Sequence, residues 1–314
     1  METLTIALSA DRTFFRQLAV VITGVSRWCD PIRHDVYVLH DGIDATLQER
    51  VAQSAGEHVH LEWIDANTPG LDDARTPSFL PMATVFRLRL EELLPTDCDR
   101  VIYLDTDTVV RRPLTELWRV DLADNLLGAV RDPFLPWAGS PQNLDWRSFG
   151  IAPDSHYFNS GVMLIPLRRW RAEGVSDQAW QLVTNHLFGD VDQAALNIVA
   201  NGRWRRLHPR WNLQGGHVVT EESHAWVVES RSVLEAARRD PAVIHYNRGS
   251  WRKPWEDRGA VGPQGPHPYR DLWFEDLDRT HWARWRPDDS RPSRLAGVSR
   301  RVKRAARALI GASG

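Results

Sequence analysis

Two carboxylates separated by one residue follow a wholly apolar run. The run is VIYL at residues 101–104, and the acids are Asp105 and Asp107, with Thr106 between them. Carboxylates at this spacing can converge on one hard divalent cation, and such a cation would neutralise a diphosphate. Acids at this spacing are also common by chance and often cap a following helix. The apolar run favours metal binding, because a buried parallel strand delivers its carboxyl end to the crevice where α/β proteins bind ligands.

A histidine and a lysine late in the chain are further candidates. His245 lies near the end of the apolar run AVIHY at residues 242–246, and Lys253 follows eight residues later in KPW. A neutral imidazole can join carboxylates around Mn²⁺, although a lone histidine at a strand end is often only a hydrogen-bonded boundary residue. Lys253 can hold phosphate as a point charge or be an ordinary surface lysine. The residues alone leave both roles open.

These candidates must be positioned by alternating strands and helices. Apolar runs at 4–8, 35–39 and 58–64 predict strands, and the segments 14–28 and 45–54 between them predict helices. Further on we expect a helix at 81–94, buried strands at 101–104 and 161–165, a helix at 192–200 and a strand at 242–246. This alternation is typical of βαβ units, so we predict an α/β fold with a mostly parallel central sheet.

Composition excludes several classes of protein. The 314 residues are 42% hydrophobic and 25% charged, as in ordinary globular proteins. Two cysteines are too few for a disulfide scaffold or a cysteine-based metal cluster. The start METLTIALSAD does not resemble a signal peptide, and no apolar run is long enough to span a membrane, so we expect a cytoplasmic protein. The sequence has no glycine-rich phosphate loop, which disfavours kinases, dehydrogenases and nucleotidyl transferases.

The charge is unevenly distributed along the chain. Residues 291–314 carry seven Lys or Arg and no acid, which leaves 32 basic and 41 acidic residues in 1–290. Apolar residues in this tail recur at three- and four-residue steps, which predicts a basic amphipathic helix. Such a helix can lie peripherally on the inner face of an anionic membrane; a packed helix and a disordered tail are the alternatives. Nucleic acid is not an expected partner, because the acidic body would oppose it.

Five motifs, taken in order, resemble one known family. They are FRLRL at 86–90, CDRVIYLDTDTVV at 98–110, YFNSGVMLI at 157–165, VDQAALN at 191–197 and HY…KPW at 245–255. In this order they resemble the family 8 glycosyltransferases, which include bacterial lipooligosaccharide galactosyltransferases and glycogenin. The resemblance covers roughly residues 1–255. Each motif is weak by itself, and the five together are specific.

The resemblance implies a GT-A (Rossmann-like) fold, a UDP-sugar donor, Mn²⁺ with Mg²⁺ as an alternative, and retention of anomeric configuration. It implies three metal ligands, Asp105, Asp107 and His245. The donor contacts that it implies are Asp11, Thr13, Arg87, Asp105, Thr106, Asp132, Asn159 and Lys253. It places Asp192 and Gln193 against the reacting anomeric carbon as the catalytic residues.

Four of these residues also have simpler interpretations. Arg87 can be a helix-surface residue, and Asp132 a turn former before a proline. Asn159 can be a cap or turn residue, and Asp192 can cap the helix that follows it. The surrounding motifs favour the functional roles.

The sequence departs from the family pattern at three places. Thr13 stands where the family often has asparagine, and Ala194 stands where many members have a second aspartate after the glutamine. The spacing from His245 to Lys253 is eight residues where six is usual, so the residues between them reshape the lid over the diphosphate. Because an amide is a poor nucleophile, we expect same-face attack by the acceptor hydroxyl in place of a covalent intermediate on Gln193.

We therefore predict a retaining, Mn²⁺-dependent hexosyltransferase. It would move glucose or galactose from a UDP-sugar to a hydroxyl acceptor on a glycan, a glycolipid or another small molecule. The alternative is a catalytically weak member of the same fold that binds a nucleotide-sugar or a membrane. We expect one catalytic domain at 1–255, an irregular extension at 256–290 and the basic amphipathic tail at 291–314.

Overall fold

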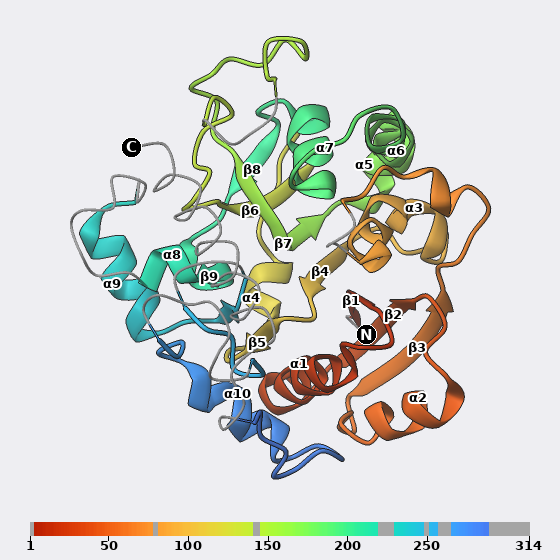
Figure 1. Cartoon of the computed structure of the whole chain (residues 1–314), viewed down its shortest axis with the longest axis vertical. Coiled ribbons are helices and arrows are strands. Elements are labelled where there is room, and N and C mark those ends of the chain that lie inside the picture. The colour runs from red at the N-terminus through yellow and green to blue at the C-terminus, as the bar shows by residue number, and fades with distance from the viewer. Residues whose placement is uncertain are drawn as a thin grey trace, which may run out of the picture.

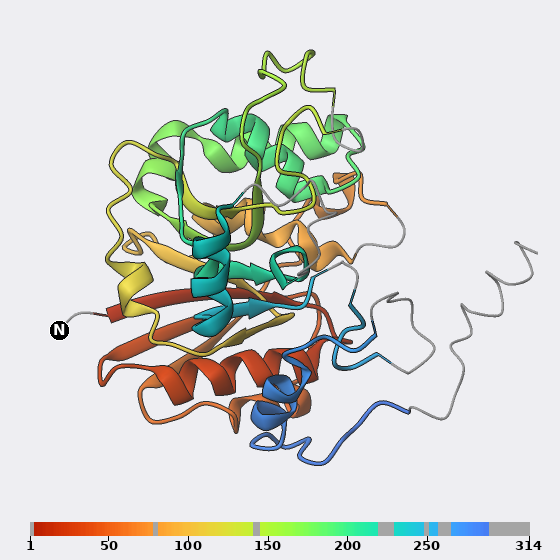
Figure 2. The ribbon, with the colours of Figure 1, turned by 90° about the vertical axis from the view of Figure 1, so that its left-hand side faces the viewer.

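The described residues form a central sheet covered by helices on both faces, with a smaller sheet at one side (Figure 1). In this computed structural model they are residues 3–77, 81–140, 145–218, 229–247, 251–256 and 265–288. The central sheet has seven strands in the order β3-β2-β1-β4-β7-β6-β8. Figure 2 shows it nearly edge-on, between α1 on one side and the α5–α7 layer on the other.

The first half of the chain builds one parallel side of this sheet. Its elements are β1 (Thr3–Ala10), α1 (Phe15–Trp28), β2 (Arg33–His40), α2 (Ala45–Ala52) and β3 (Val59–Asp65). Strands β1, β2 and β3 pair in parallel, and β4 (Val101–Asp105) pairs in parallel with β1. The predicted alternation of strands and helices is therefore confirmed in this half, with boundaries that differ by one or two residues.

The second half reverses direction at β7. Strand β7 (Phe158–Ile165) runs antiparallel to both β4 and β6 (Leu127–Arg131), and β8 (Trp204–Arg206) pairs in parallel with β6. The antiparallel pairing places the start of β7 beside the end of β4. The carboxylates that follow β4 and the polar residues that open β7 therefore meet at one edge of the sheet.

Two apolar layers hold the helices to the sheet. Leu18 and Ile22 of α1 pack with Leu8 and Leu104 on one face of the sheet. On the other face, side chains of β4 and β7 pack against α5 (Leu167–Glu173), α6 (Val175–Asn185) and α7 (Val191–Ala200). Every residue of the VIYL run is buried, because strand β4 lies between both layers.

A second sheet of three strands carries the late strand that the sequence predicted. Its order is β5 (Thr108–Val110), β10 (Val243–His245) and β9 (Leu213–Gln214), with β10 antiparallel to β5 and parallel to β9. Further helices are α4 (Thr115–Trp118), α8 (Gly215–Val218) and α9 (Arg231–Arg239), and a 3₁₀ turn covers Pro209–Asn212. The strand is therefore present, but it lies outside the central sheet.

The prediction of one helix at 81–94 is wrong. The segment forms two 3₁₀ turns, Met82–Thr84 and Phe86–Arg89, followed by the short α3 (Leu90–Leu93). Phe86, Arg87 and Leu88 are all buried, so three successive side chains of the segment are enclosed by the protein. An α-helix would have turned part of this run toward solvent, whereas the tighter 3₁₀ turns bury successive residues.

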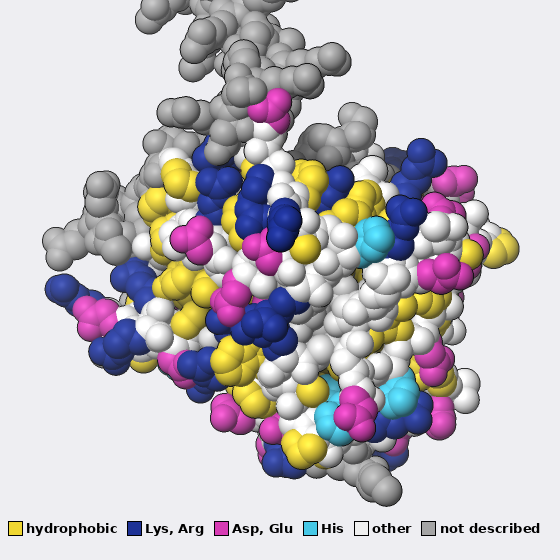
Figure 3. Space-filling model, turned by 90° about the horizontal axis from the view of Figure 1, so that it is seen from below, with side chains coloured by type: hydrophobic (Ala, Val, Ile, Leu, Met, Phe, Trp, Pro, Cys, Tyr) yellow, Lys and Arg dark blue, Asp and Glu magenta, His cyan; other side chains and the backbone are white. Residues whose placement is uncertain are grey.

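The expectation of an irregular C-terminal extension is corrected in part. Residues 270–277 form α10 (Arg270–Leu277), and its Trp273 and Leu277 are completely buried. Arg16 lies between the rings of Phe15 and Trp285, with its guanidinium carbon 4.6 and 4.4 Å from the two ring centroids. Figure 3 views this side of the molecule, where basic, acidic and hydrophobic side chains are interspersed. Several tryptophans of the extension therefore pack the extension onto the body.

The tail at 291–314 lies outside the described residues. Among the residues that are described, no helix combines the length and the apolar character that crossing a membrane requires.

Candidate active site

A cavity of about 950 Å³ opens at the carboxyl ends of β1 and β4. Its walls contain nearly every residue that the sequence nominated: Asp11, Arg87, Asp105, Thr106, Asp107, Asp132, Asn159, Asp192, Gln193, His245 and Lys253. Thr13 is the exception, since it is exposed and is not part of the wall. The fold thus brings together residues that lie far apart along the chain, and the volume is sufficient for a substrate-sized ligand.

The acidic turn is held by its own neighbours. Asp105 ends β4, and its Oδ1 accepts a hydrogen bond from the Tyr103 hydroxyl at 3.0 Å. The Thr108 hydroxyl donates to the Asp105 backbone oxygen at 2.7 Å and closes the turn. Asp107 precedes β5 directly, so the main chain fixes both carboxylates relative to the sheet.

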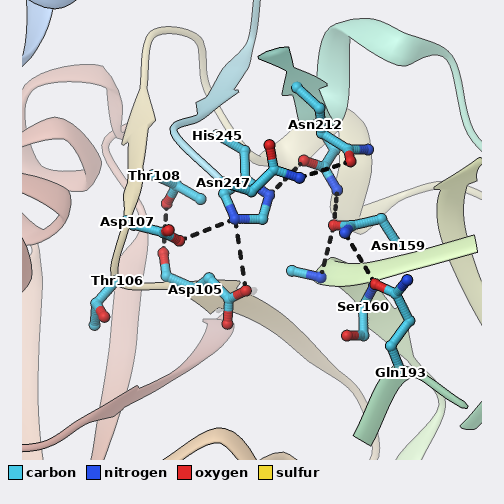
Figure 4. A network of polar contacts seen from close by, with 12 residues as sticks. Asp105, Thr106, Asp107, Thr108, Asn159, Ser160, Gln193, Asn212, His245 and Asn247 are labelled. Atoms are coloured by element: carbon cyan, nitrogen blue, oxygen red, sulfur yellow. Dashed lines mark hydrogen bonds and ion pairs between the residues drawn. The ribbon is translucent and has the colours of Figure 1, made fainter. Parts of the chain in front are cut away.

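His245 reaches this turn through main-chain pairing. In the β5–β10 ladder His245 lies opposite Thr108, and the Tyr246 backbone N–H donates to the backbone carbonyl oxygen of Asp107 at 2.9 Å. The His245 Nε2 atom lies 2.9 Å from Asp107 Oδ1 and 3.6 Å from Asp105 Oδ2 (Figure 4). One ligand atom from each of the three residues lies within 4.8 Å of the other two.

Gly161 makes room for this arrangement. A Cβ atom at this position of β7 would lie 2.3 Å from His245 Cε1 and 2.7 Å from Asp105 Oδ2. Any side chain here would push the imidazole away from the carboxylates. Position 161 therefore requires glycine because of this close approach.

The three residues fit a divalent cation. The buried His245 Nε2 atom faces two carboxylates, and its 2.9 Å contact with Asp107 Oδ1 does not have the geometry of a hydrogen bond. Two carboxylate oxygens and one imidazole nitrogen form a ligand set that suits Mn²⁺ and similar ions. The structure therefore contains a plausible Asp-Asp-His metal site.

Lys253 already pairs with one of these acids. Its Nζ donates to Asp107 Oδ2 at 2.8 Å, and its side chain retains 20% exposure. Burial works to raise the pKa of Asp107, but Lys253 and His245 together hold that pKa far below its usual range. Asp107 is therefore ionised throughout the physiological range and available to a cation.

Arg87 is bound by protein groups on every side. Its guanidinium pairs with Asp105 Oδ1 at 2.6 Å and with Asp192 Oδ2 at 3.1 Å, and it donates to the backbone oxygens of Thr84 and Ser160. Burial lowers the pKa of Arg87, and the two carboxylates more than reverse this effect, so the group stays charged. Arg87 lies at the cavity wall as predicted and links the acidic turn to helix α7.

A network of amides and carboxylates forms the opposite wall. Gln193 Oε1 accepts from Asn159 Nδ2 at 2.9 Å and from the Ser160 N–H at 3.2 Å. Gln193 Nε2 donates to Asp132 at 3.2 Å and to Asp190 at 3.3 Å. Asp132 also accepts two backbone N–H groups of the turn that it begins, so it is both a turn former and a wall residue.

Asp192 does not cap the helix that begins near it. Its Oδ2 accepts from the Ser160 hydroxyl at 2.9 Å and pairs with Arg87, and no side-chain cap bond is formed at the start of α7. Burial raises the pKa of Asp192, and the adjacent Arg87 counteracts this. The carboxylate is therefore fully engaged by the protein.

Asp190 and Asn212 are among the polar residues of the site that the sequence analysis missed. Asp190 lies in the cavity wall and accepts from the Tyr157 hydroxyl at 2.7 Å; burial, with Asp132 and Asp192 nearby, raises its pKa to about 6. Asn212 is completely buried behind His245. Asp190 could have been found from its place three residues before Gln193, whereas Asn212 is the last residue of a 3₁₀ turn that no pattern predicted.

The outer end of the cavity contains Asp11. Its Oδ1 accepts from the backbone N–H and the hydroxyl of Thr13, both at 2.6 Å. These contacts stay inside one turn after β1, where Thr13 is exposed. Among the residues that the structure describes, no hydrogen bond joins the Asp11 side chain to a more distant part of the chain.

Comparison with known proteins identifies the class. The chain is 27% identical to general stress protein A of Bacillus subtilis, over 90% of this chain and 95% of that protein. It is 24% identical to lipopolysaccharide 1,2-glucosyltransferase of Escherichia coli, over 83% of this chain and 75% of that protein. A solved structure of the galactosyltransferase LgtC, in complex with donor and acceptor sugar analogs, superposes with a TM-score of 0.67 at 26% identity, covering 88% of this chain and 96% of that one.

These likenesses, with the sheet order and the cavity, define a glycosyltransferase of the GT-A-like α/β fold, and the predicted fold class is confirmed. The family model described as glycosyl transferase family 8 matches residues 5–259. The chain belongs to glycosyl transferase family 8, so the predicted family and the prediction of a hexosyltransferase enzyme are confirmed.

Proposed function

We propose that this enzyme is a retaining, Mn²⁺-dependent transferase that moves a hexose from a UDP-sugar to a hydroxyl acceptor. The observation that carries the proposal is the cluster of Asp105, Asp107 and His245, whose ligand atoms lie within 4.8 Å of one another in the wall of the large cavity. A donor diphosphate needs compensating positive charge as its sugar leaves. This cluster is where such charge can be held.

Asp105, Asp107 and His245 would hold the metal, and the bound ion would supply Lewis-acid stabilisation of the leaving diphosphate. Mg²⁺ is the alternative ion. Lys253 would add a second positive charge to the diphosphate once its contact with Asp107 is exchanged for phosphate. Thr106 and Asp11 lie along the cavity from β4 toward β1, so we assign the nucleotide to this side, with Thr13 supporting Asp11.

Arg87, Asp132 and Asn159 shape the part of the cavity assigned to the donor sugar. Arg87 would act there mainly by fixing Asp105 and Asp192, since its guanidinium is already occupied by protein groups. Asp132 and Asn159 would orient the Gln193 amide and offer hydrogen-bonding atoms to sugar hydroxyls.

The contacts of Gln193 and Asp192 favour same-face attack over a covalent sugar–enzyme intermediate. The Gln193 carbonyl oxygen accepts two hydrogen bonds, which reduces the nucleophilicity of an already weak amide. The Asp192 carboxylate is tied to Arg87 and Ser160. The acceptor hydroxyl would then attack from the side of the departing UDP, whose phosphate takes the proton.

The names of two relatives guide the choice of sugar. One is a glucosyltransferase and one a galactosyltransferase, so we propose glucose or galactose as the transferred hexose. The acceptor would be a hydroxyl of a glycan, a glycolipid or another small molecule. We further propose that residues 1–255 form the catalytic domain, with 256–290 as an extension. The tail at 291–314 would add peripheral contact with an anionic membrane surface, so that the enzyme would act in the cytoplasm at the inner face.

The test is UDP release from a panel of nucleotide-sugars with and without Mn²⁺. We expect release with UDP-glucose or UDP-galactose that requires Mn²⁺ and is lost in Asp105→Asn. A matched control is Asp99→Asn, which changes an exposed aspartate far from the cavity and should keep full activity. UDP release that does not require Mn²⁺ would contradict the proposed metal dependence. No UDP release with any donor would contradict the proposed activity and favour a binding protein without turnover.

A further inference from the structure

The completely buried Asn212 has both ends of its amide engaged at the active site. It ends the 3₁₀ turn Pro209–Asn212, directly before β9. Its Oδ1 lies 3.0 Å from His245 Nδ1, and its Nδ2 donates to Asn159 Oδ1 at 2.9 Å. Asn212 lies behind the imidazole, outside the cavity wall, and so cannot touch substrate.

The direction of each hydrogen bond follows from one group that can only donate. The Gly161 backbone N–H points to Asn159 at 3.0 Å, so the receiving atom must be the Asn159 oxygen. The Asn212 atom that faces this oxygen must then be its NH₂ group. The Asn212 oxygen consequently faces His245 Nδ1, which must donate to it.

With Nδ1 as the donor, the Nε2 atom of a neutral His245 is left as the metal-binding atom, and it faces Asp105 and Asp107. An imidazole that donates from Nδ1 presents Nε2 in the form that binds a metal ion. Histidine ligands commonly have such a partner on the other ring nitrogen, and loss of the partner weakens metal binding by about 10- to 100-fold.

The same amide chain continues to the opposite wall. Asn159 Nδ2 donates to Gln193 Oε1 at 2.9 Å, so the amides of Asn212 and Asn159 connect His245 with the amide of Gln193 (Figure 4). All three side chains are more than nine-tenths buried. In such an enclosed chain each amide has one satisfied orientation, because reversing any of them would place two donors or two acceptors face to face.

We propose that Asn212 is a positioning residue: it orients His245 toward the metal ion and couples that ligand to the Gln193 amide. This inference rests on the proposed metal site. The Asn212–His245 contact sets metal affinity, and the Asn212–Asn159 contact sets the orientation of Gln193. Two substitutions separate the two roles.

The experiment measures Mn²⁺ affinity without nucleotide, by electron paramagnetic resonance titration, and then Mn²⁺-saturated turnover. Asn212→Leu removes both contacts, and we expect its Mn²⁺ affinity to fall about 10- to 100-fold. Asn212→Asp keeps an acceptor for His245 Nδ1 but loses the donor to Asn159. We expect its affinity to stay within about threefold of the wild type while its kcat falls at least about tenfold.

Asn197→Leu is the matched control. Asn197 is an equally buried amide that bonds the backbone of Phe158 and of Gln193 without touching His245. Its loss should leave Mn²⁺ affinity unchanged. An equal loss of affinity in Asn197→Leu and Asn212→Leu would show a general packing defect and overturn the inference.

The remaining outcomes are also decisive. Wild-type Mn²⁺ affinity in folded Asn212→Leu overturns the inference and leaves the proposed function standing. If Asn212→Leu does not fold, Asn212→Asp decides: retained affinity with reduced turnover supports the inference, and lost affinity overturns it. A wild-type protein that binds no Mn²⁺ and releases no UDP contradicts the proposed function itself.

Discussion

The two ends of the cavity are built differently. At the inner end, Arg87, Asp105 and His245 are bonded to residues from several strands and helices. At the outer end, Asp11 is bonded within its own turn to Thr13. The inner end is therefore fixed before any ligand arrives, as stabilisation of charge in a transition state requires. The outer end can adjust to its ligand, so substitutions there should cost far less.

The largest effect is expected for Asp107→Asn, which removes one carboxylate of the proposed metal site at the inner end of the cavity. We expect kcat for UDP release to fall at least about 1000-fold, because bound metal contributes several kcal/mol of charge stabilisation in the transition state. Initial rates at saturating donor and Mn²⁺ measure this. A loss of less than about tenfold would remove Asp107 from the metal site.

Arg87→Met should have the next largest effect, this time on stability. It leaves Asp105 and Asp192 without their shared cation, and Asp192 is only 7% exposed, so we expect the free energy of unfolding to fall by about 3 kcal/mol. Urea denaturation measures it. Arg168→Met is the matched control, since the Arg168–Asp99 pair is exposed and its loss should not be measurable. Equal effects of the two substitutions would contradict the special role of the inner end.

Asp190→Asn should produce a smaller, pH-dependent gain in stability. The pKa of Asp190 is raised to about 6, mainly by burial, above its unfolded value of about 4. The folded state therefore binds the proton more tightly, and stability falls as pH rises from about 4 to about 6. Asparagine still accepts from Tyr157 and removes this penalty.

We therefore expect Asp190→Asn to be more stable than the wild type by about 2 kcal/mol at pH 7.5 and equal to it near pH 4. Thermal or urea unfolding at the two pH values provides the measurement. A gain that is the same at both pH values would show that the charge of Asp190 is not its cause.

The smallest effect is expected for Asp11→Ala at the outer end of the cavity. Without the carboxylate the turn at Thr13 is no longer held in place for the donor, and we expect donor binding to weaken by about 1 kcal/mol. This free energy corresponds to about a fivefold rise in KM for the donor. The kcat should remain within about twofold. Steady-state kinetics with varied donor tests this, and a kcat loss like that of Asp107→Asn would show that both ends are equally rigid.

The inner end was also the part that sequence predicted best. The apolar run of β4 and the acids after it reflect a physical requirement, since a strand buried on both faces has to be apolar up to the residue that reaches the cavity. The glycine of FNSG, by contrast, is explained by a tertiary contact, the close approach of His245 to β7. The order of the five motifs indicated the family, and the resemblance to that family implied the GT-A fold.

Other features depended on tertiary contacts that no local pattern encodes. Asn212 acquires its place only when β9, β10 and β7 come together. The segment at 81–94 resembled a helix because its apolar residues are frequent, and it breaks into 3₁₀ turns because Arg87 is drawn inward to Asp105 and Asp192. Tertiary ion pairing overrides a weak helical preference in this case.

The pairing of β10 with β5 has a consequence for biosynthesis. During translation β4 and its two acids leave the ribosome long before His245, which joins these acids only when β10 pairs with β5. A nascent or truncated chain that ends before β10 carries the acids but lacks the imidazole and Lys253. Such a chain would therefore lack part of the proposed metal site, which only the complete catalytic core could assemble.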